Sequence, residues 1–257
     1  MALPASGQIT LDQIHVEAGG STGTQATLND TDIRTLAGIS TGQIAFNNLH
    51  GKSAGITLKS YGMVINTNSN STSYSGSLSA SVAVGDMIVL AKTTGYGDYN
   101  YGSTTVQGSS PTIIASNRSW VNPIYGHFQF LRFTATSAAS SISVSCSEGS
   151  TNRQAMYVYA WLIGGGAQYE DSDRVGAVAN QTLTVDTGED GAIIVGSAYT
   201  YSAYAMPNLN NTDYETTFDR NYHVWVGHAV QSGTAATYSM PVAQAGSNNH
   251  IASFTKA

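Results

Sequence analysis

The sequence predicts an all-β fold: a jelly-roll-type β-sandwich built from an internally duplicated cassette, preceded by a small irregular N-terminal segment. Three observations predict this class. The C-terminal half repeats the pattern of the half before it, apolar residues alternate with a period of two, and clusters of Ser, Thr, Gly and Asn separate the alternating stretches. An amphipathic period of 3.6 residues is found only in short pieces near the start of the sequence.

The duplication is visible as two pairs of similar segments at one spacing. HFQFLRF from His127 recurs as HVWVGHAV from His223, and NRQAMYVYAWLI from Asn152 recurs as NNHIASF from Asn248. Both spacings are 96 residues (223 − 127 and 248 − 152). One supersecondary unit has therefore been used twice. The two cassettes cover about residues 77–163 and 181–255. After a first strand at 56–67, we expect strands near 77–83, 86–92, 112–116, 127–135, 140–146 and 154–163, a bridge at 164–176, and strands near 181–186, 191–199, 222–231, 236–241 and 249–255. Each cassette should supply alternating strands to both sheets of one sandwich, and two separate small sandwiches are the alternative.

The alternation also indicates which strand faces are buried. Phe128 and Phe130 point to one side of their strand, and the pattern breaks near Leu131–Arg132, as a β-bulge would make it. Val224 and Val226 are the matching core positions in the second cassette. The segment 157–163 (YVYAWLI) is apolar on both faces, so we expect it to be either central in its sheet or part of a contact between subunits.

Composition excludes several classes of protein. Charged residues make up 10% of the chain, against roughly 25% in typical soluble domains, so small polar residues must cover the surface. A net charge of −6 gives no basic stripe for nucleic acid. Cys146 is the only cysteine, no apolar run is long enough to span a membrane, and we expect no signal peptide. Proteins that are assembled in the cytoplasm but function on a virion surface fit this combination.

Residues 1–53 contain a short repeat of their own, in segments 6–14, 24–33 and 41–49. Each unit joins a strand-like step to an Asp or Asn that is placed to cap one helical turn. The expected cap residues are Asp12, Asn29 or Asp30, and Asn47. DIRTLAGIS is the longest helical piece and should end at Gly38. Because each unit has few aliphatic residues, we expect the segment to fold against a partner or around the axis of a homotrimer. The expected attachment and assembly residues are Ile9, Leu11, Ile14, Ile44, Phe46 and Leu49.

The N-terminal repeats resemble the N-termini of tailed-bacteriophage structural proteins, notably tail fibres and other virion surface proteins. LPASGQITLDQI (3–14) and GQIAFNNLHGKS (42–53) carry the resemblance. The resemblance implies that residues 1–53 attach the chain to other virion proteins. It also implies that the chain is located in the virion after assembly in the host cytoplasm, as part of an appendage for which a homotrimer is a suitable assembly. Residues 54–257 form the β-part, which is broadly similar to jelly-roll-like modules of phage appendages.

Two long polar stretches, one in each cassette, are the candidate recognition loops. Residues 93–126 and 199–222 should leave equivalent strand ends and are rich in Tyr, Asn, Asp and Gly. Aromatic rings beside small polar groups are typical of recognition loops and could stack on host glycans. Packing of the rings within the protein or in a subunit interface is the alternative. The candidate ligand-binding residues are Tyr96, Tyr99, Tyr101, Trp120, Tyr201, Tyr204, Asn210 and Tyr214.

We expect no catalytic, metal or cofactor site. A glycosidase would need two close carboxylates, and the loop acids match no catalytic motif; these acids are Asp98, Asp213, Glu215 and Asp219. The acidic runs 170–173 and 186–190 are incomplete as calcium loops. His127, His223 and His228 lack a matching third ligand in both cassettes, which favours satisfied strand histidines.

These observations favour a non-enzymatic virion protein of the tail-fibre or receptor-binding type. A capsid-decoration or head-fibre protein is the alternative, and a glycan-cleaving appendage is the third possibility.

Overall fold

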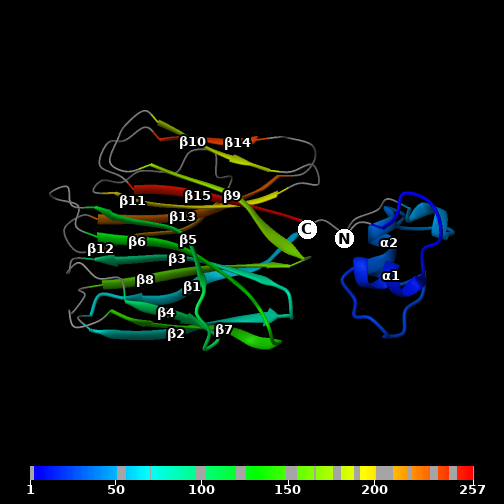
Figure 1. Ribbon diagram of the computed structural model, residues 1–257, viewed down its shortest axis with the longest axis horizontal. Helices are drawn as coiled ribbons and strands as arrows, with labels where there is room; N and C mark the ends of the chain where they lie inside the picture. The colour runs from blue at the N-terminus through cyan, green and yellow to red at the C-terminus, as the bar shows by residue number, and fades with distance from the viewer. Residues whose placement is uncertain are drawn as a thin grey trace.

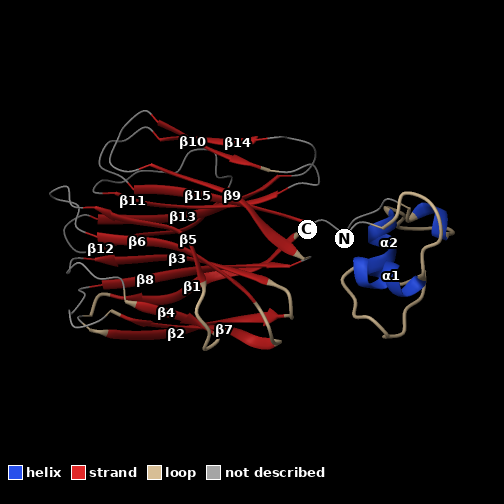
Figure 2. Ribbon diagram, in the orientation of Figure 1, coloured by secondary structure: helices blue, strands red, loops and turns tan. Residues whose placement is uncertain are grey.

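The computed structural model describes residues 3–50, 56–69, 71–95, 102–119, 126–148, 155–164, 166–175, 181–187, 192–200, 211–218, 222–231, 237–242 and 248–256. A small helical N-terminal module lies beyond one end of a long β-body, beside the chain's C-terminus (Figure 1). Helices occur only in the module within this part of the chain, and strands only in the β-body (Figure 2).

The module contains one short helix from each repeated unit: α1 (Leu11–Glu17), α2 (Thr31–Ala37) and the 3-10 helix η1 (Phe46–Asn48). α1 starts with a capping box, in which Thr10 Oγ1 accepts from the Gln13 amide at 3.1 Å and Gln13 Oε1 accepts from the Thr10 amide at 2.8 Å. The cap is therefore Thr10, not the expected Asp12. Gly38 ends α2 in the left-handed conformation (φ 72°), as the sequence predicts.

The module has a core of its own. Ile9, Ile14 and Leu49, from the first and third units, are buried together with Ile33 and Leu36 of α2. The expectation that the segment needs a partner to form a core is therefore wrong: the three units bury their aliphatic residues against one another within one chain. The other predicted attachment residues are less buried, with Leu11 and Ile44 partly buried and Phe46 39% exposed.

One described ion pair links the module to the β-body. The Lys256 ammonium in the last strand binds Glu17 Oε1 at the end of α1, and both side chains are about 95% buried. Burial alone would raise the pKa of Glu17, but the hydrogen bond and positive charge of Lys256 outweigh it and hold that pKa below its ordinary value.

In the fold each cassette starts earlier than the sequence indicates, so that the first covers residues 57–164 and the second residues 167–256. The first cassette supplies eight described strands to the β-body. They are β1 (Thr57–Thr67), β2 (Ser73–Val82), β3 (Met87–Gly95), β4 (Ser103–Val106), β5 (Thr112–Ser119), β6 (Gly126–Thr134), β7 (Ala139–Ser147) and β8 (Ala155–Gly164). The second cassette supplies β9 (Ala167–Val175), β10 (Gln181–Asp186), β11 (Ala192–Thr200), β12 (Asn211–Phe218), β13 (Tyr222–Gln231), β14 (Thr237–Val242) and β15 (Asn248–Lys256).

The described strands form four antiparallel sheets, and none of these four contains strands of both cassettes. The first cassette makes a five-stranded sheet β1-β8-β3-β6-β5 and a three-stranded sheet β2-β7-β4. The second makes β9-β15-β11-β13-β12 and a two-stranded sheet β10-β14. The orders of the two five-stranded sheets match strand for strand, so the duplication predicted from the sequence is present in the fold.

Three apolar cores separate four layers. The central core joins the two five-stranded sheets and includes Phe130, Trp161 and Phe254. A second core lies between the first five-stranded sheet and β2-β7-β4, and a third between the second five-stranded sheet and β10-β14. The small sheets therefore form the outer layers, at the bottom and the top of the view in Figure 1.

The all-β sandwich architecture is confirmed, but the expected mixing of the two cassettes in a jelly roll is wrong. Each cassette forms its own sandwich, and the two sandwiches share a buried face. The segment 157–163 lies in β8, which is buried over its whole length and runs between β1 and β3. Of the two expectations for this segment, the one of a strand inside its sheet is therefore correct.

The spacing of 96 residues between the two copies does not hold along the whole cassette. This follows from the partners of β3, which pairs with β6 and β8, and of β11, which pairs with β13 and β15. Leu90 of β3 pairs with Leu131 and Ala160, which are 29 residues apart (160 − 131). Val195 of β11 pairs with His228 and Ala252, which are 24 apart (252 − 228). In the second cassette β13 and β15 are thus five residues closer in the chain than β6 and β8 are in the first. A spacing of 96 matches β6 with β13, whereas β8 matches β15 at 91.

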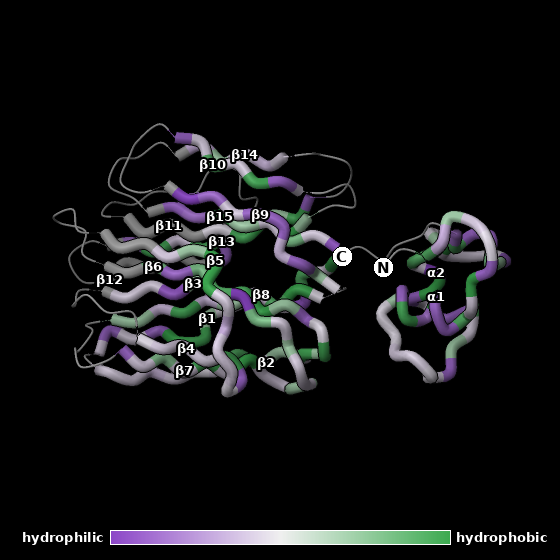
Figure 3. Tube along the Cα trace, in the orientation of Figure 1, coloured by the Kyte–Doolittle hydropathy of each residue, from purple (hydrophilic) through white to green (hydrophobic). Residues whose placement is uncertain are grey.

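Three strands are absent from the sequence prediction: β4, β9 and β12. β9 lies in the acidic stretch that the sequence suggests is a bridge, and Figure 3 shows part of it as hydrophilic. It is nevertheless an edge strand whose carboxylates bind a neighbouring strand. Asp173 Oδ2 accepts from the Thr184 amide at 2.9 Å, and Asp171 Oδ2 accepts from the Asp186 amide at 3.2 Å. These bonds join β9 to β10 of the outer sheet.

A buried ion pair lies inside the first sandwich. The Lys92 ammonium binds Glu148 Oε1, and both side chains are at least 97% buried. Lys92 also donates to Thr104 Oγ1 at 3.2 Å, and Thr104 in turn contacts the Cys146 thiol. Burial raises the pKa of Cys146, so the thiol stays protonated. Cys146 is thus a buried residue of β7.

Candidate functional site

Most of the predicted recognition residues lie outside the described part of the chain: Tyr96, Tyr99, Tyr101, Trp120, Tyr201, Tyr204 and Asn210. The backbone of Tyr214 is described and pairs with Val226 within β12, so this residue belongs to a strand rather than to a long loop. The prediction of a glycan-binding surface on these loops therefore remains a prediction.

The shared face of the two five-stranded sheets is the site that the fold brings together, and we call it the seam. At one edge β1 contacts β12, and at the other edge β5 contacts β9. Because β1 corresponds to β9 and β5 to β12, the duplication relates the two edges to each other. The cassettes thus present the same face to one another, as the two subunits of an isologous dimer do.

The edge formed by β1 and β12, the Asp213 edge, contains a buried polar cluster. Asp213 Oδ1 lies 2.6 Å from His228 Nδ1, and Trp161 Nε1 donates to Asp213 Oδ2 at 2.8 Å. The Asp213 side chain is only 1% exposed. The Tyr61 ring packs against the His228 ring with centroids 4.9 Å apart. A carboxylate on imidazole Nδ1 orients the ring, and Trp161 extends this network from the second cassette to the first.

Tyr159 extends the cluster. Burial, followed by the nearby Asp213 carboxylate and Tyr61, raises its pKa far above the ordinary value, so its hydroxyl stays protonated at any physiological pH. His228 is therefore a satisfied strand histidine, as the sequence predicts. His127 and His223 lie next to the first residues of β6 and β13, which agrees with their expected places at strand ends.

A β-bulge places Asp213 in this cluster, and the bulge recurs in the other cassette. In β12 the pairing with β13 shifts between Thr212 and Tyr214, which leaves Asp213 as the extra residue. In β5 the pairing with β6 shifts between Ile113 and Ala115, which leaves Ile114. Bulges re-aim side chains, and Ile114 packs against the central core. The bulge that the sequence suggests at Leu131–Arg132 thus lies on the neighbouring strand β5.

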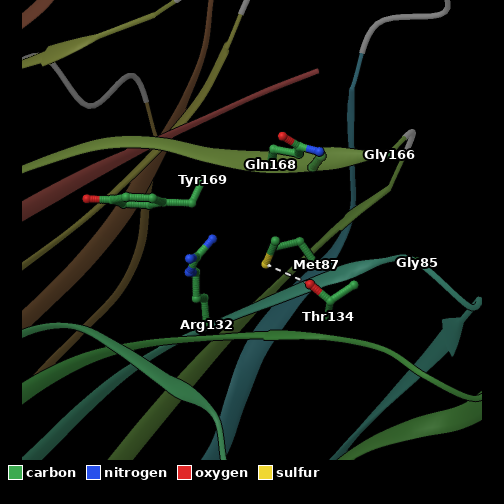
Figure 4. Close-up of a pocket in the computed structure, with 8 residues that line it drawn as sticks. Gly85, Met87, Arg132, Thr134, Gly166, Gln168 and Tyr169 are labelled. Carbon is green, nitrogen blue, oxygen red and sulfur yellow. Dashed lines mark hydrogen bonds between the residues drawn. The ribbon is translucent and has the colours of Figure 1, made fainter. Parts of the chain in front are cut away.

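Beside the edge formed by β5 and β9, which we call the Arg132 edge, a pocket of about 400 Å³ lies between β9 and the strands β3 and β6. The Arg132 side chain extends from β6 toward β9, and its Cζ lies 4.8 Å from the centre of the Tyr169 ring (Figure 4). Gln168 and Tyr169 of β9 form one wall, and Met87 and Thr134 form the opposite wall (Figure 4). A cation over an aromatic face is an attractive geometry that holds the guanidinium in place.

Arg132 and His228 occupy matched positions. Arg132 pairs with Thr112 and His228 with Asn211, each two residues before the bulge residue of the adjacent strand. Each side chain also contacts a tyrosine across the seam, Tyr169 for Arg132 and Tyr61 for His228. The difference lies in the bulge residue, which is a carboxylate beside His228 and an aliphatic side chain beside Arg132.

His250 lies inside the seam between the two edges. It is 1% exposed, and its ring stacks on Phe128 of the other cassette with centroids 4.4 Å apart. Neither ring nitrogen has a hydrogen-bond partner among the described residues. Burial, assisted by the positive charge of Arg174, lowers the pKa of His250 to about 3, so the ring is neutral in the folded protein.

Asp213 is the one residue considered for catalysis whose side chain the structure describes. Asp98 and Asp219 lie outside the described residues, and Asp213 is bound to Trp161 and His228. The described residues contain no group of three or more His, Cys, Asp or Glu that could hold a metal ion. Neither α-helix in this part of the chain is long and apolar enough to cross a membrane.

Comparison with known proteins adds no assignment: no family model, curated protein or solved structure matches the chain.

Sequence reasoning alone missed the Arg132 pocket. Tyr169 and Gln168 belong to β9, whose acidic composition conceals its strand character. One signal was available, because the 96-residue spacing that matches Phe130 with Val226 also matches Arg132 with His228. An arginine at a duplicated position of a half-buried strand is a candidate for ligand binding.

Proposed function

We propose that the protein is a non-enzymatic structural protein of a tailed-phage virion, of the tail-fibre or receptor-binding type. The N-terminal module attaches the chain to other virion proteins, and the paired sandwiches are presented to the host surface. The observation that carries the proposal is the organisation of residues 3–50. The repeats that resemble phage attachment segments form a separate module with its own core.

Phe46 is the best candidate for the attachment surface. The other five predicted residues are buried or partly buried in the module, whereas Phe46 is 39% exposed. Val16, on α1, is also exposed, at 43%. Exposed large apolar side chains on so small a module are suitable for contact with another protein.

Incorporation into particles tests the attachment role. Phe46→Ser in the full-length chain should leave the fold intact and lower incorporation several-fold, because the substitution removes exposed apolar surface without opening the core. Val84→Ser is the matched control, since Val84 is 67% exposed on the β-body and should not affect incorporation. Deletion of residues 1–53 should abolish incorporation altogether. Normal incorporation of the deleted protein would refute the attachment role.

The receptor-binding role rests on the polar composition of the surface and on the aromatic residues of the two long loops. Host surface glycan or protein is the proposed partner. Glycan-array binding by the full-length protein tests this role, and variants of Tyr96 and Tyr204 should weaken any binding that the loops provide. Unchanged glycan binding in both variants would refute the proposal that these two loops form the binding surface. A capsid-decoration or head-fibre role remains the alternative, because the N-terminal resemblance is shared by both.

The homotrimer stays a prediction that follows from the resemblance. The argument from uncovered apolar residues is weaker, because the aliphatic residues of the module and both faces of β8 are covered within one chain. The mass in light scattering decides the question: one chain is 26.9 kDa, so a trimer is about 81 kDa (3 × 26.9). A stable mass near that of one chain at micromolar concentration would refute it.

A further inference from the structure

Arg132 has a charge that the described protein does not neutralise. Its side chain is half-buried, and no hydrogen bond or ion pair among the described residues reaches its guanidinium. The carboxylates that neighbour the pocket residues are used elsewhere. Asp86 binds Lys59 at 2.6 Å, and Glu170 accepts from the Thr255 hydroxyl at 3.0 Å. A half-buried cation in a pocket that has no counter-charge is suited to binding an anionic group of a ligand.

The duplication indicates what the missing group is. At the matched position of the second cassette, His228 receives the carboxylate of Asp213 from the bulge of β12. In the first cassette the same bulge of β5 holds Ile114, which has no charge. The two edges therefore match in the position of the basic side chain, of the tyrosine that it contacts and of the bulge, but only one of them carries an internal carboxylate.

We propose that the pocket at the Arg132 edge binds the carboxylate of an acidic sugar, such as a uronic or sialic acid residue. The planar guanidinium fork of arginine pairs with a carboxylate through two parallel hydrogen bonds. The pocket volume of about 400 Å³ is within the usual range of small-molecule sites and exceeds what a simple ion needs.

The other pocket walls also suit a sugar ring. The Thr134 hydroxyl, which donates to Met87 Sδ at 4.0 Å, can accept from a ring hydroxyl, while Met87 provides an apolar surface for the C–H groups. The proposal that Arg132 binds a carboxylate does not depend on the proposed role of the protein in the virion. Only the assignment of the sugar to a host surface rests on the proposed function.

Binding of free sugars to the full-length protein tests the proposal directly. D-glucuronate, D-galacturonate and N-acetylneuraminate would be titrated by calorimetry and by NMR of the arginine Nε–H resonances, beside uncharged D-glucose and acetate. At least one acidic sugar should bind saturably and shift the Arg132 resonance. Glucose and acetate should bind at least tenfold more weakly, since each lacks half of the recognised chemistry. No saturable binding by any acidic sugar, or equally tight binding of acetate, would overturn the proposal.

Two substitutions separate the charge from the shape of the pocket. Arg132→Gln should weaken binding about tenfold or more, because it removes a charge-assisted bidentate contact. Ile114→Asp should also weaken binding, because it gives Arg132 the internal carboxylate that His228 has in the second cassette. Ile114→Asn is the matched neutral control and should retain binding. Wild-type affinity in Arg132→Gln would contradict the assignment, even if the Ile114 variants failed to fold.

These outcomes are independent of the particle experiments. A protein that binds acidic sugars but does not enter virions would retain this site and lose the proposed function. If the protein enters virions but binds no acidic sugar, the proposed function is retained and the acidic-sugar site is refuted.

Discussion

Replacing Phe130 with alanine tests the packing of the two cassettes. The side chain is 1% exposed, and its ring centroid lies 5.7 Å from Phe128, 5.9 Å from Trp161 and 6.4 Å from His250. His250 belongs to the second cassette, so the cavity left by the substitution would lie between two sheets that are each held by their own ladders. Such a site collapses poorly, and we expect the upper part of the usual range for core Phe→Ala changes, about 4–5 kcal/mol.

Urea titration of the full-length protein measures this loss, with an unchanged slope as the check that unfolding remains comparable. Val226→Ala, at the matched position of the second cassette, removes fewer carbon atoms and should cost about 2 kcal/mol. Ile113→Ala on neighbouring β5 is the control, because Ile113 is 55% exposed and should change stability by less than about 0.5 kcal/mol. A loss below about 1 kcal/mol for Phe130→Ala would refute the assignment of this strand face to the seam.

Three further predictions concern buried charges. Glu148→Gln removes the counter-charge of buried Lys92 and should destabilise the protein by about 3–5 kcal/mol in urea titration, whereas Lys92→Met combined with Glu148→Leu should cost less than half as much. The unfolded His250 takes up a proton below about pH 6.5, but the folded residue does so only near pH 3, so stability should fall across this window as the pH drops, by up to roughly 1.4 kcal/mol per pH unit. His250→Phe should flatten that dependence, and an unchanged slope would show that the ring is not buried. Lys256→Met should raise the pKa of Glu17, as measured by carboxyl NMR titration, because burial would then act without the lysine.

The local features of the fold were predictable from the sequence because they depend on neighbouring residues. The alternation in FQFLRF and HVWVGHAV indicated strands with Phe130 and Val226 on their buried faces, and both are in the central core. Gly38 marked the end of α2 because glycine adopts the left-handed conformation without strain. The repeat itself needed only a comparison of the sequence with itself.

The arrangement of the sheets was not predictable in the same way, because it depends on contacts between the cassettes. Strands that alternate correctly can interleave in one large sandwich or form two that share a face, and periodicity does not distinguish these arrangements. One signal favoured the observed fold: β8 is apolar on both faces, as a strand must be when its sheet is covered on both sides. β9 was missed because its acidic residues bind the backbone of β10 rather than water.

The Asp213 cluster and its counterpart at Ile114 depend on two bulges, of which the sequence suggests only one and places it on the neighbouring strand. A bulge changes the face to which later residues point, so Asp213 seemed to be a loop acid until its strand pairing was known. The matched pair of bulges then gave the comparison between Ile114 and Asp213. That comparison became available only once the pairing of β5 with β6 was defined.

Locating the protein on intact particles tests the proposed function most directly. A small epitope tag after Ala257 would be detected by gold labelling in electron microscopy. Tag binding to the purified full-length protein would be the positive control. We expect label on the tail or its fibres, and removal of residues 1–53 should eliminate it. Label confined to the capsid would favour the decoration role, and the absence of label from purified particles that accept a tag on another virion protein would contradict the account.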